Sequence, residues 1–93
     1  MNKPTLENIK NLAFLSNESY KTAVDTVQKG KEKEQMSFKQ PLINPATNSS
    51  FEVYNQADND SSGFSATVFK DTSTGEYVIA FRGTEIGNGK ISA

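Results

Sequence analysis

The sequence predicts an α+β chain, with helices in its N-terminal third and an antiparallel β-meander in its C-terminal half. Apolar residues recur at helical spacing between residues 5 and 28. Later in the chain, three runs suited to β-strands are separated by turn-forming sequences. A chain of 93 residues has room for one small domain with a thin core.

Two helices are expected over residues 5–28, although one bent helix would satisfy the same pattern. The first apolar stripe consists of Leu6, Ile9, Leu12 and Ala13. The second, at positions i, i+3, i+4 and i+7, consists of Tyr20, Ala23, Val24 and Val27. Thr5 or Pro4 can begin the first helix. Ser16 or Asn17 can end it and cap the second.

Residues 29–49 are expected to form a linker between the helical and the strand halves. Gly30 stands where a helix C-cap in the left-handed region would be expected. The alternating charges of residues 29–34 are typical of a solvated helix end or loop. Further along, Pro41 and Pro45 interrupt a stretch without any sustained period, which indicates a surface connection.

Three strands are expected at about residues 50–55, 63–70 and 76–82. The sequences QADNDSS and DTSTG separate them, and both consist of turn formers. The second turn is short enough for a tight hairpin with Gly75 at positive φ. Antiparallel pairing of the last two strands is therefore the safest structural prediction.

The third strand is apolar at five successive positions, Tyr77-Val78-Ile79-Ala80-Phe81. A strand with only one covered face would alternate between apolar and polar residues. We therefore expect an interior strand that is covered on both faces. The helices can cover one face, so the other requires the remainder of the protein's own chain or a homo-oligomeric copy.

Composition excludes several classes of function. Ten Lys and Arg balance eleven Asp and Glu, which argues against nucleic acid as a partner. The absence of Cys and His removes thiolate and imidazole ligands and the usual general base, so neither a metal nor a cofactor is expected. The N-terminus lacks an apolar run long enough for a signal peptide or a transmembrane segment. A cytoplasmic location and export by a route without such a signal both remain open.

Two short patterns could belong to an ester-cleaving enzyme. The first, Gly63-Phe64-Ser65-Ala66-Thr67, looks like a nucleophile elbow whose last glycine is missing. An elbow needs a strand before the serine and a helix after it, with small residues on both sides. Ser65 instead follows a polar turn and precedes Thr67-Val68-Phe69, which favours a serine in a strand.

The second pattern is Arg82-Gly83-Thr84, directly after the apolar strand. A glycine there lets the backbone approach a reacting carbonyl, and a hydroxyl can add a donor to backbone N–H groups in an oxyanion hole. The same three residues are also a common way to leave a sheet, with Arg as a solvated strand end, Gly as the turn and Thr as a cap.

The stretch GFSATVFKDTSTGEYVIAFRGTE resembles the start of class 3 lipases and related bacterial lipase-like α/β-hydrolases. In that family a strand, a TG-type hairpin and a strand ending in FRGT or FRGS precede the oxyanion loop. The resemblance covers about residues 63–85 and is most specific at residues 79–84. The upstream NLAFLSNESY is similar, more loosely, to the family's N-terminal helix.

The resemblance implies that Thr84 is the oxyanion-hole residue, that Gly83 shapes the loop and that Arg82 supports the strand end. It implies an N-terminal fragment of an α/β-hydrolase fold over residues 1–93, divided into helices (5–28), linker (29–49), strands (50–84) and a final loop (85–93). Similar enzymes hydrolyse carboxylic esters of acylglycerols or phospholipids with a GxSxG serine, an aspartate and a histidine. This sequence lacks GxSxG and histidine, so no catalysis by these residues alone is expected, and a lipid ester is a substrate only for a longer chain.

A second interpretation of the same residues stays open. The chain would then be a complete, non-catalytic α+β interaction module that buries its apolar strand against a copy of itself or another protein. Both interpretations explain the apolar third strand.

Overall fold

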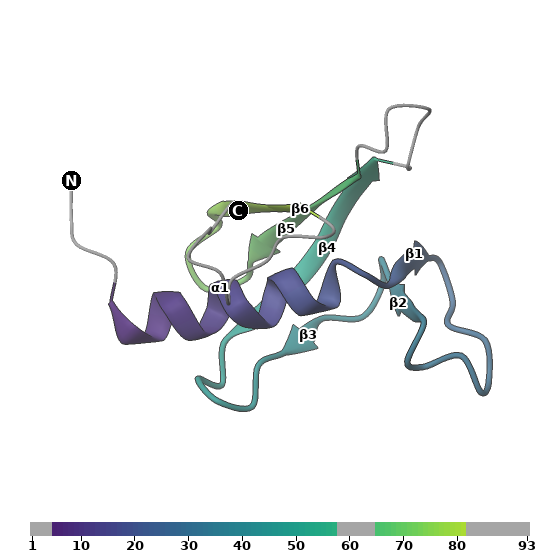
Figure 1. The fold of residues 1–93 in the computed structure, drawn as a ribbon, viewed down its shortest axis with the longest axis horizontal. Coiled ribbons are helices and arrows are strands. Elements are labelled where there is room, and N and C mark those ends of the chain that lie inside the picture. Colours follow the sequence, from purple (N-terminus) through teal and green to yellow (C-terminus); the bar gives the residue numbers. More distant parts are fainter. Residues whose placement is uncertain (1–4, 58–64, 82–93) are drawn as a thin grey trace.

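The computed structural model describes residues 5–57 and 65–81. These residues form a small α+β domain, which confirms the predicted class at that level. One helix is followed by six strands: α1 (Leu6–Glu18), β1 (Thr22–Val24), β2 (Gln35–Ser37), β3 (Leu42–Ile43), β4 (Ser50–Ala57), β5 (Ala66–Asp71) and β6 (Tyr77–Phe81). Helix α1 lies beside a four-stranded sheet, and the short pair β1–β2 lies near the end of α1 (Figure 1).

Helix α1 begins where the sequence predicts. Thr5 is the N-cap residue, with extended backbone, and its side chain accepts a hydrogen bond from Asn8 N–H at 3.0 Å. The helix continues to Glu18, past the predicted end at residues 16–17. After the last turn, Lys21 Nζ lies 2.9 Å from Glu18 Oε1 and forms an ion pair. The first predicted helix is therefore confirmed, and its last residue lies within one turn of the predicted end.

The second predicted helix is wrong. Two of its apolar positions, Ala23 and Val24, lie in β1, which pairs in parallel with β2 in the register Ala23↔Met36. Thr22 and Val24 are β-branched and suit an extended strand, so the helical spacing around them was coincidental. The predicted linker is also not structureless, because it contains β2 and β3. Gly30 has the expected positive φ, +87°, but in the β1–β2 connection and not at a helix end.

The antiparallel meander is confirmed. The four-stranded sheet has the order β3-β4-β5-β6, and all of its pairings are antiparallel. The register of β4 against β5 shifts between Val53 and Asn55, which marks a β-bulge. Gly75 has φ +77° in the β5–β6 hairpin, as predicted, and its N–H donates to the Asp71 carbonyl at 2.8 Å.

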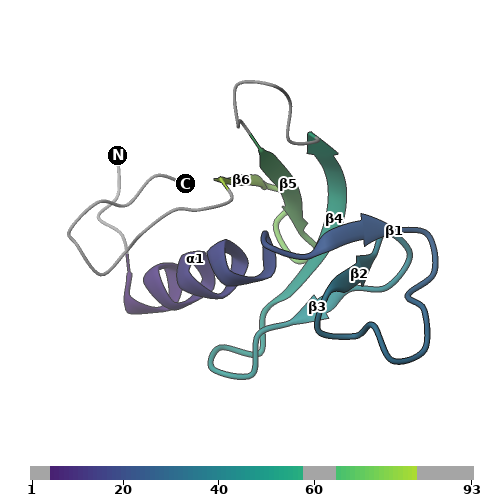
Figure 2. The ribbon, with the colours of Figure 1, turned by 45° about the vertical axis from the view of Figure 1, so that its right-hand side comes forward.

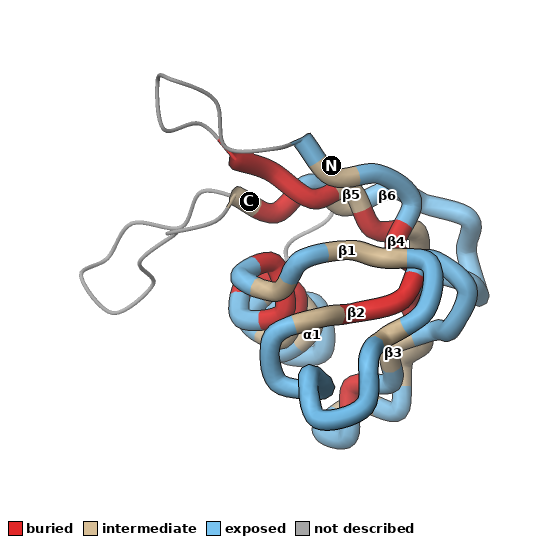
Figure 3. The backbone as a smooth tube through the Cα atoms, turned by 90° about the vertical axis from the view of Figure 1, so that its right-hand side faces the viewer, coloured by how far each residue is buried: buried red, intermediate tan, exposed pale blue. Residues whose placement is uncertain are grey.

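The core lies between the sheet, β2 and the C-terminal half of α1. Its buried members are Leu15, Met36, Phe51, Val53, Phe69 and Ala80. Figure 3 shows the buried segments of α1, β2 and β5 as red stretches of the tube, whereas the β1–β2 connection is exposed.

The predicted apolar stripe of α1 is not its buried face. Leu6 is 67% and Ile9 is 51% exposed, whereas Leu15 is fully buried. The reason is the placement of the helix, whose N-terminal half extends past the strands on the side away from β1 and β2 (Figures 1 and 2). Among the described residues, the buried positions of α1 lie in its C-terminal half, which packs against the sheet.

Within the described residues, one face of residues 77–81 is covered and the other is open, so the expected second cover, from the remainder of the chain or a copy, stays a prediction. There β6 is the last strand of its sheet. Val78 packs against the core and Ala80 is fully buried in it. Tyr77 and Ile79, which point to the opposite face, are 53% and 48% exposed. The strand therefore alternates between a covered and an open face although every side chain in it is apolar or aromatic.

Candidate functional site

The three predicted site residues, Arg82, Gly83 and Thr84, lie outside the described residues. The structure does describe the strand that leads to them. Strand β6 pairs with β5 along its whole length, and Ala80 is buried close to its carboxyl end. A packed strand thus holds the backbone immediately before the predicted oxyanion segment.

Ser65 is not at a nucleophile elbow. It is 6% exposed and directly precedes β5, and its hydroxyl lies 3.4 Å from the Ala57 carbonyl, to which it donates. An elbow would place a helix directly behind the serine, whereas Ala66 begins a strand here. The rejection of the elbow is confirmed for the described part of this motif, since Gly63 and Phe64 lie outside it.

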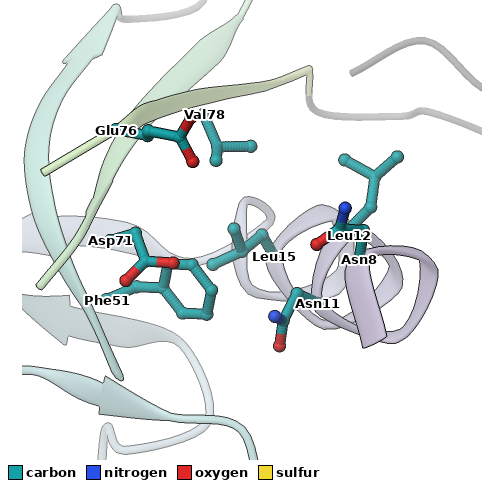
Figure 4. Close-up of a pocket in the computed structure, with 8 residues that line it drawn as sticks. All are labelled: Asn8, Asn11, Leu12, Leu15, Phe51, Asp71, Glu76 and Val78. Atoms are coloured by element: carbon teal, nitrogen blue, oxygen red, sulfur yellow. The ribbon is translucent and has the colours of Figure 1, made fainter. Parts of the chain in front are cut away.

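A pocket of about 260 Å³ opens between α1 and the β5–β6 hairpin. Figure 4 shows Asn8, Asn11 and Leu12 on the helix side, Leu15 and Phe51 between helix and sheet, and Asp71, Glu76 and Val78 on the sheet side. Its volume is below the roughly 300–1,000 Å³ of typical small-molecule sites. The pocket combines an apolar floor with two carboxylates and two amides.

Asp71 shapes the hairpin beside this pocket. Its Oδ1 accepts hydrogen bonds from the Ser73 N–H at 2.8 Å and from the Ser73 hydroxyl at 2.7 Å. Burial pushes the pKa of the Asp71 carboxyl upward, but these hydrogen bonds and one from the Thr74 backbone outweigh it, so the pKa is lowered. Asp71 is therefore an ionised turn residue and not a general acid.

The amide of Asn11 belongs to a polar cluster that fastens residues 44–49 to α1. Asn44 Nδ2 donates to Asn11 Oδ1 at 2.9 Å, and Asn11 Nδ2 donates to Ser49 Oγ at 3.1 Å. The Thr47 hydroxyl also donates to Asn11 Oδ1. Asn44 is only 3% exposed. The sequence pattern does not reveal this cluster, because Asn11 lies more than thirty residues before the other three members and shares no local spacing with them.

The described residues do not assemble a catalytic centre by themselves. The chain has no histidine that could act as a base. The hydroxyl of Ser16 is buried and lacks a hydrogen-bond partner among the described residues, so nothing there activates it as a nucleophile. In the same part of the chain, no three acidic side chains gather as metal ligands would.

Within residues 5–57 and 65–81, no helix has the length and apolar character needed to cross a membrane.

The geometry of the described site is that of a packed hairpin with a small adjoining pocket. Comparison of the chain with protein-family models, with curated proteins and with solved structures finds no match.

Proposed function

We propose that the chain carries the oxyanion strand and loop of a lipase- or esterase-like hydrolase that cleaves carboxylic esters of acylglycerols or phospholipids. The observation that carries the proposal is the resemblance of residues 63–85 to class 3 lipases. It is supported by the β5–β6 hairpin, in which a TG turn with Gly75 at φ +77° connects two paired strands, the second of which ends directly before Arg82.

In this proposal Thr84 supplies its backbone N–H, and its hydroxyl as an added donor, to the oxyanion of the tetrahedral intermediate. Gly83 allows the backbone to come close to the ester carbonyl, and Arg82 supports the end of the strand. The larger fold is then an α/β-hydrolase, of which this α+β chain is the N-terminal part. A serine, an aspartate and a histidine from outside these 93 residues complete the site, because the chain contains no histidine and no GxSxG motif.

The first experiment is to determine the coding sequence beyond the codon of Ala93. The proposal expects GxSxG, then an aspartate and a histidine, within the next few hundred codons. The longer protein should hydrolyse p-nitrophenyl butyrate and octanoate and should react with a fluorophosphonate probe. A stop codon at position 94 in an intact locus, or a longer protein with neither activity nor labelling, would refute the hydrolase proposal.

A substitution then tests the role of Thr84 in the longer protein. Loss of one oxyanion-hole donor lowers kcat by roughly 10²–10³ in known cases. Thr84→Val removes only the hydroxyl, so we expect a large fall in kcat with KM nearly unchanged. Thr26→Val, at an exposed position on the β1–β2 connection, is the matched control and should leave both constants unchanged. Equal activity of the two variants would exclude the Thr84 hydroxyl as an oxyanion donor.

A second candidate is a non-catalytic interaction module, and the open face of the sheet favours it. Tyr54 and Tyr77 are 60% and 53% exposed there, and their rings meet edge to face with centroids 4.9 Å apart. Ile79 adds a further exposed apolar side chain. Exposed aromatic residues grouped in this way are typical of protein-binding surfaces. The coding sequence beyond Ala93 separates this candidate from the hydrolase.

A further inference from the structure

The outer edge of β6 carries backbone groups that β5 does not use. Asp71 N–H donates to the Glu76 carbonyl at 2.8 Å, so these two residues form a hydrogen-bonded pair of the ladder. Hydrogen-bonded and non-hydrogen-bonded pairs alternate along antiparallel strands, and the register from there to Phe81 has no shift. The N–H and C=O groups of Tyr77 and Ile79 therefore point away from β5. In the described part of the chain, no other strand pairs with this edge.

Apolar side chains flank this edge on the open face of the sheet, and others are exposed on α1. Tyr77 and Ile79 are about half exposed on the open face. On the face that α1 covers, Leu6 and Ile9 are exposed on the half of the helix that extends past the strands (Figure 2). Edge strands that remain unpaired usually carry Lys, Pro or a bulge that discourages pairing. Strand β6 has none of these three features.

We propose that β6 pairs with β6 of a second copy of this chain, antiparallel and edge to edge, about a two-fold axis at Val78. Tyr77 of each copy then stands opposite Ile79 of the other. Each of these pairs exchanges both of its N–H···O bonds, which uses the backbone groups that point away from β5. The two sheets join into one continuous sheet across an isologous interface.

The charges of this edge fit a second copy. Strand β6 contains no charged residue, and in the proposed register Glu76 stands opposite Ala80 of the other copy and not opposite another carboxylate. On the open face, Glu52 and Lys70 are directly paired across β4 and β5. The net charge of the chain is −1, so two copies repel each other only weakly.

A two-fold axis perpendicular to the sheet keeps both helices on one face. The exposed Leu6 and Ile9 of each copy then lie on the face of the joined sheet that the helices share. The inference does not depend on ester hydrolysis, because it concerns only the sheet edge of these 93 residues. Its outcome is therefore separate from that of the hydrolase test.

Sedimentation velocity of the 93-residue chain over a range of concentrations is the first test. The wild type should approach twice the mass of one chain as its concentration rises. Ile79→Lys places a charge beside the edge and should leave a monomer with an unchanged far-UV circular dichroism spectrum. Tyr54→Lys is the matched control, because Tyr54 is exposed on the same face but lies on the interior strand β4. That variant should still dimerise.

A wild type that remains monomeric at all concentrations would overturn the proposal. So would dimers that Tyr54→Lys abolishes and Ile79→Lys preserves, because the open face and not the edge would then form the contact.

Disulfide trapping tests the register and does not depend on the folding of the lysine variants. The chain has no cysteine, so one introduced residue reports on one position. Val78 stands opposite itself across the proposed axis, as a non-hydrogen-bonded pair with Cα atoms about 4.5 Å apart, within the range of a disulfide. Val78→Cys should form a covalent dimer on mild oxidation, and Lys70→Cys, one strand further in, should not. Equal trapping at both positions would contradict the edge-to-edge arrangement.

Discussion

Gln56 and Ala23 join the two sheets through a side chain. The Oε1 atom of Gln56, on β4, accepts a hydrogen bond from the Ala23 N–H of β1 at 2.9 Å. Its Nε2 atom donates to the Lys21 carbonyl and to the Thr67 hydroxyl, each at 2.9 Å. The amide thus pairs with the β1 segment as the backbone of a neighbouring strand would, and it ties β1 to the four-stranded sheet.

Gln56→Ala should lower the free energy of unfolding by about 2–3 kcal/mol. The substitution removes three hydrogen bonds, each of which contributes about 1 kcal/mol net, and it leaves the 1% exposed Thr67 hydroxyl without this partner. Gln40→Ala, at an exposed position, is the control and should change stability by less than about 0.5 kcal/mol. Urea unfolding at pH 7 measures both. Equal effects would show that the link between the sheets contributes little.

Asn11→Ala should destabilise the chain more than Asn8→Ala, one turn earlier on the same helix. Asn11 holds Asn44, Thr47 and Ser49 through its side-chain amide, so its loss leaves the buried Asn44 partly unpaired, at a cost of about 1–3 kcal/mol. Asn8 is exposed, and both substitutions raise helix propensity alike. Thermal melts of the two variants give the comparison. Melting temperatures lowered equally would contradict a stabilising role for the cluster.

Local patterns predicted the elements that local chemistry determines. Thr5 was a correct helix start because a hydroxyl side chain caps the free N–H groups of the first turn. Gly75 was a correct hairpin residue because its φ of +77° lies in a region that other residues rarely adopt. The strands around it followed from β-propensity and turn spacing. The same hairpin leads into the predicted oxyanion segment, which was proposed from the resemblance of residues 63–85 to class 3 lipases.

Patterns failed where distant partners determine the structure. The spacing of Ala23 and Val24 suits a helix, but pairing with β2 and the Gln56 side chain hold this segment extended. In β6, the apolar run predicted two covered faces, and the described residues cover only the face of Val78 and Ala80, so a cover for the other face stays a prediction. The polar cluster around Asn11 has no sequence signature, since its members come together only in the folded chain.

Gly75→Ala should cost about 1 kcal/mol of stability, and Gly75→Asn should cost less. A Cβ at this position would meet no atom within 4 Å, so the only penalty is the positive φ, which Asn tolerates better than Ala. Thermal or urea unfolding of the two variants measures the order. An alanine variant as stable as the wild type would show that the turn readily adopts another conformation.

Stability should fall in acid partly through Asp71. Because hydrogen bonds lower its folded-state pKa below the ordinary value of 3.8, the ionised form stabilises the fold at pH values above that ordinary value. This contribution is lost as the pH falls through the lowered pKa. Asp71→Asn keeps a side-chain acceptor for Ser73 but removes the charge.

The variant should therefore melt below the wild type at pH 7, and the difference should shrink as the pH falls below the ordinary value of 3.8. Asp25→Asn, at an exposed position, is the control and should show a smaller change. A wild-type advantage that stays constant as the pH falls would exclude ionisation as its cause.

Leu15→Ala and Leu6→Ala distinguish the buried face of α1 from the stripe that spacing predicted. Leu15 is fully buried against the sheet, and removal of a buried leucine costs about 2–5 kcal/mol because a cavity remains. Leu6 is 67% exposed, so its truncation should cost less than about 0.5 kcal/mol. Urea unfolding should be carried out at low protein concentration, where a dimer through β6 would dissociate. Under those conditions, a large loss from Leu6→Ala would mean that the N-terminal half of the helix is packed within a single chain, and it would restore the face that the sequence first suggested.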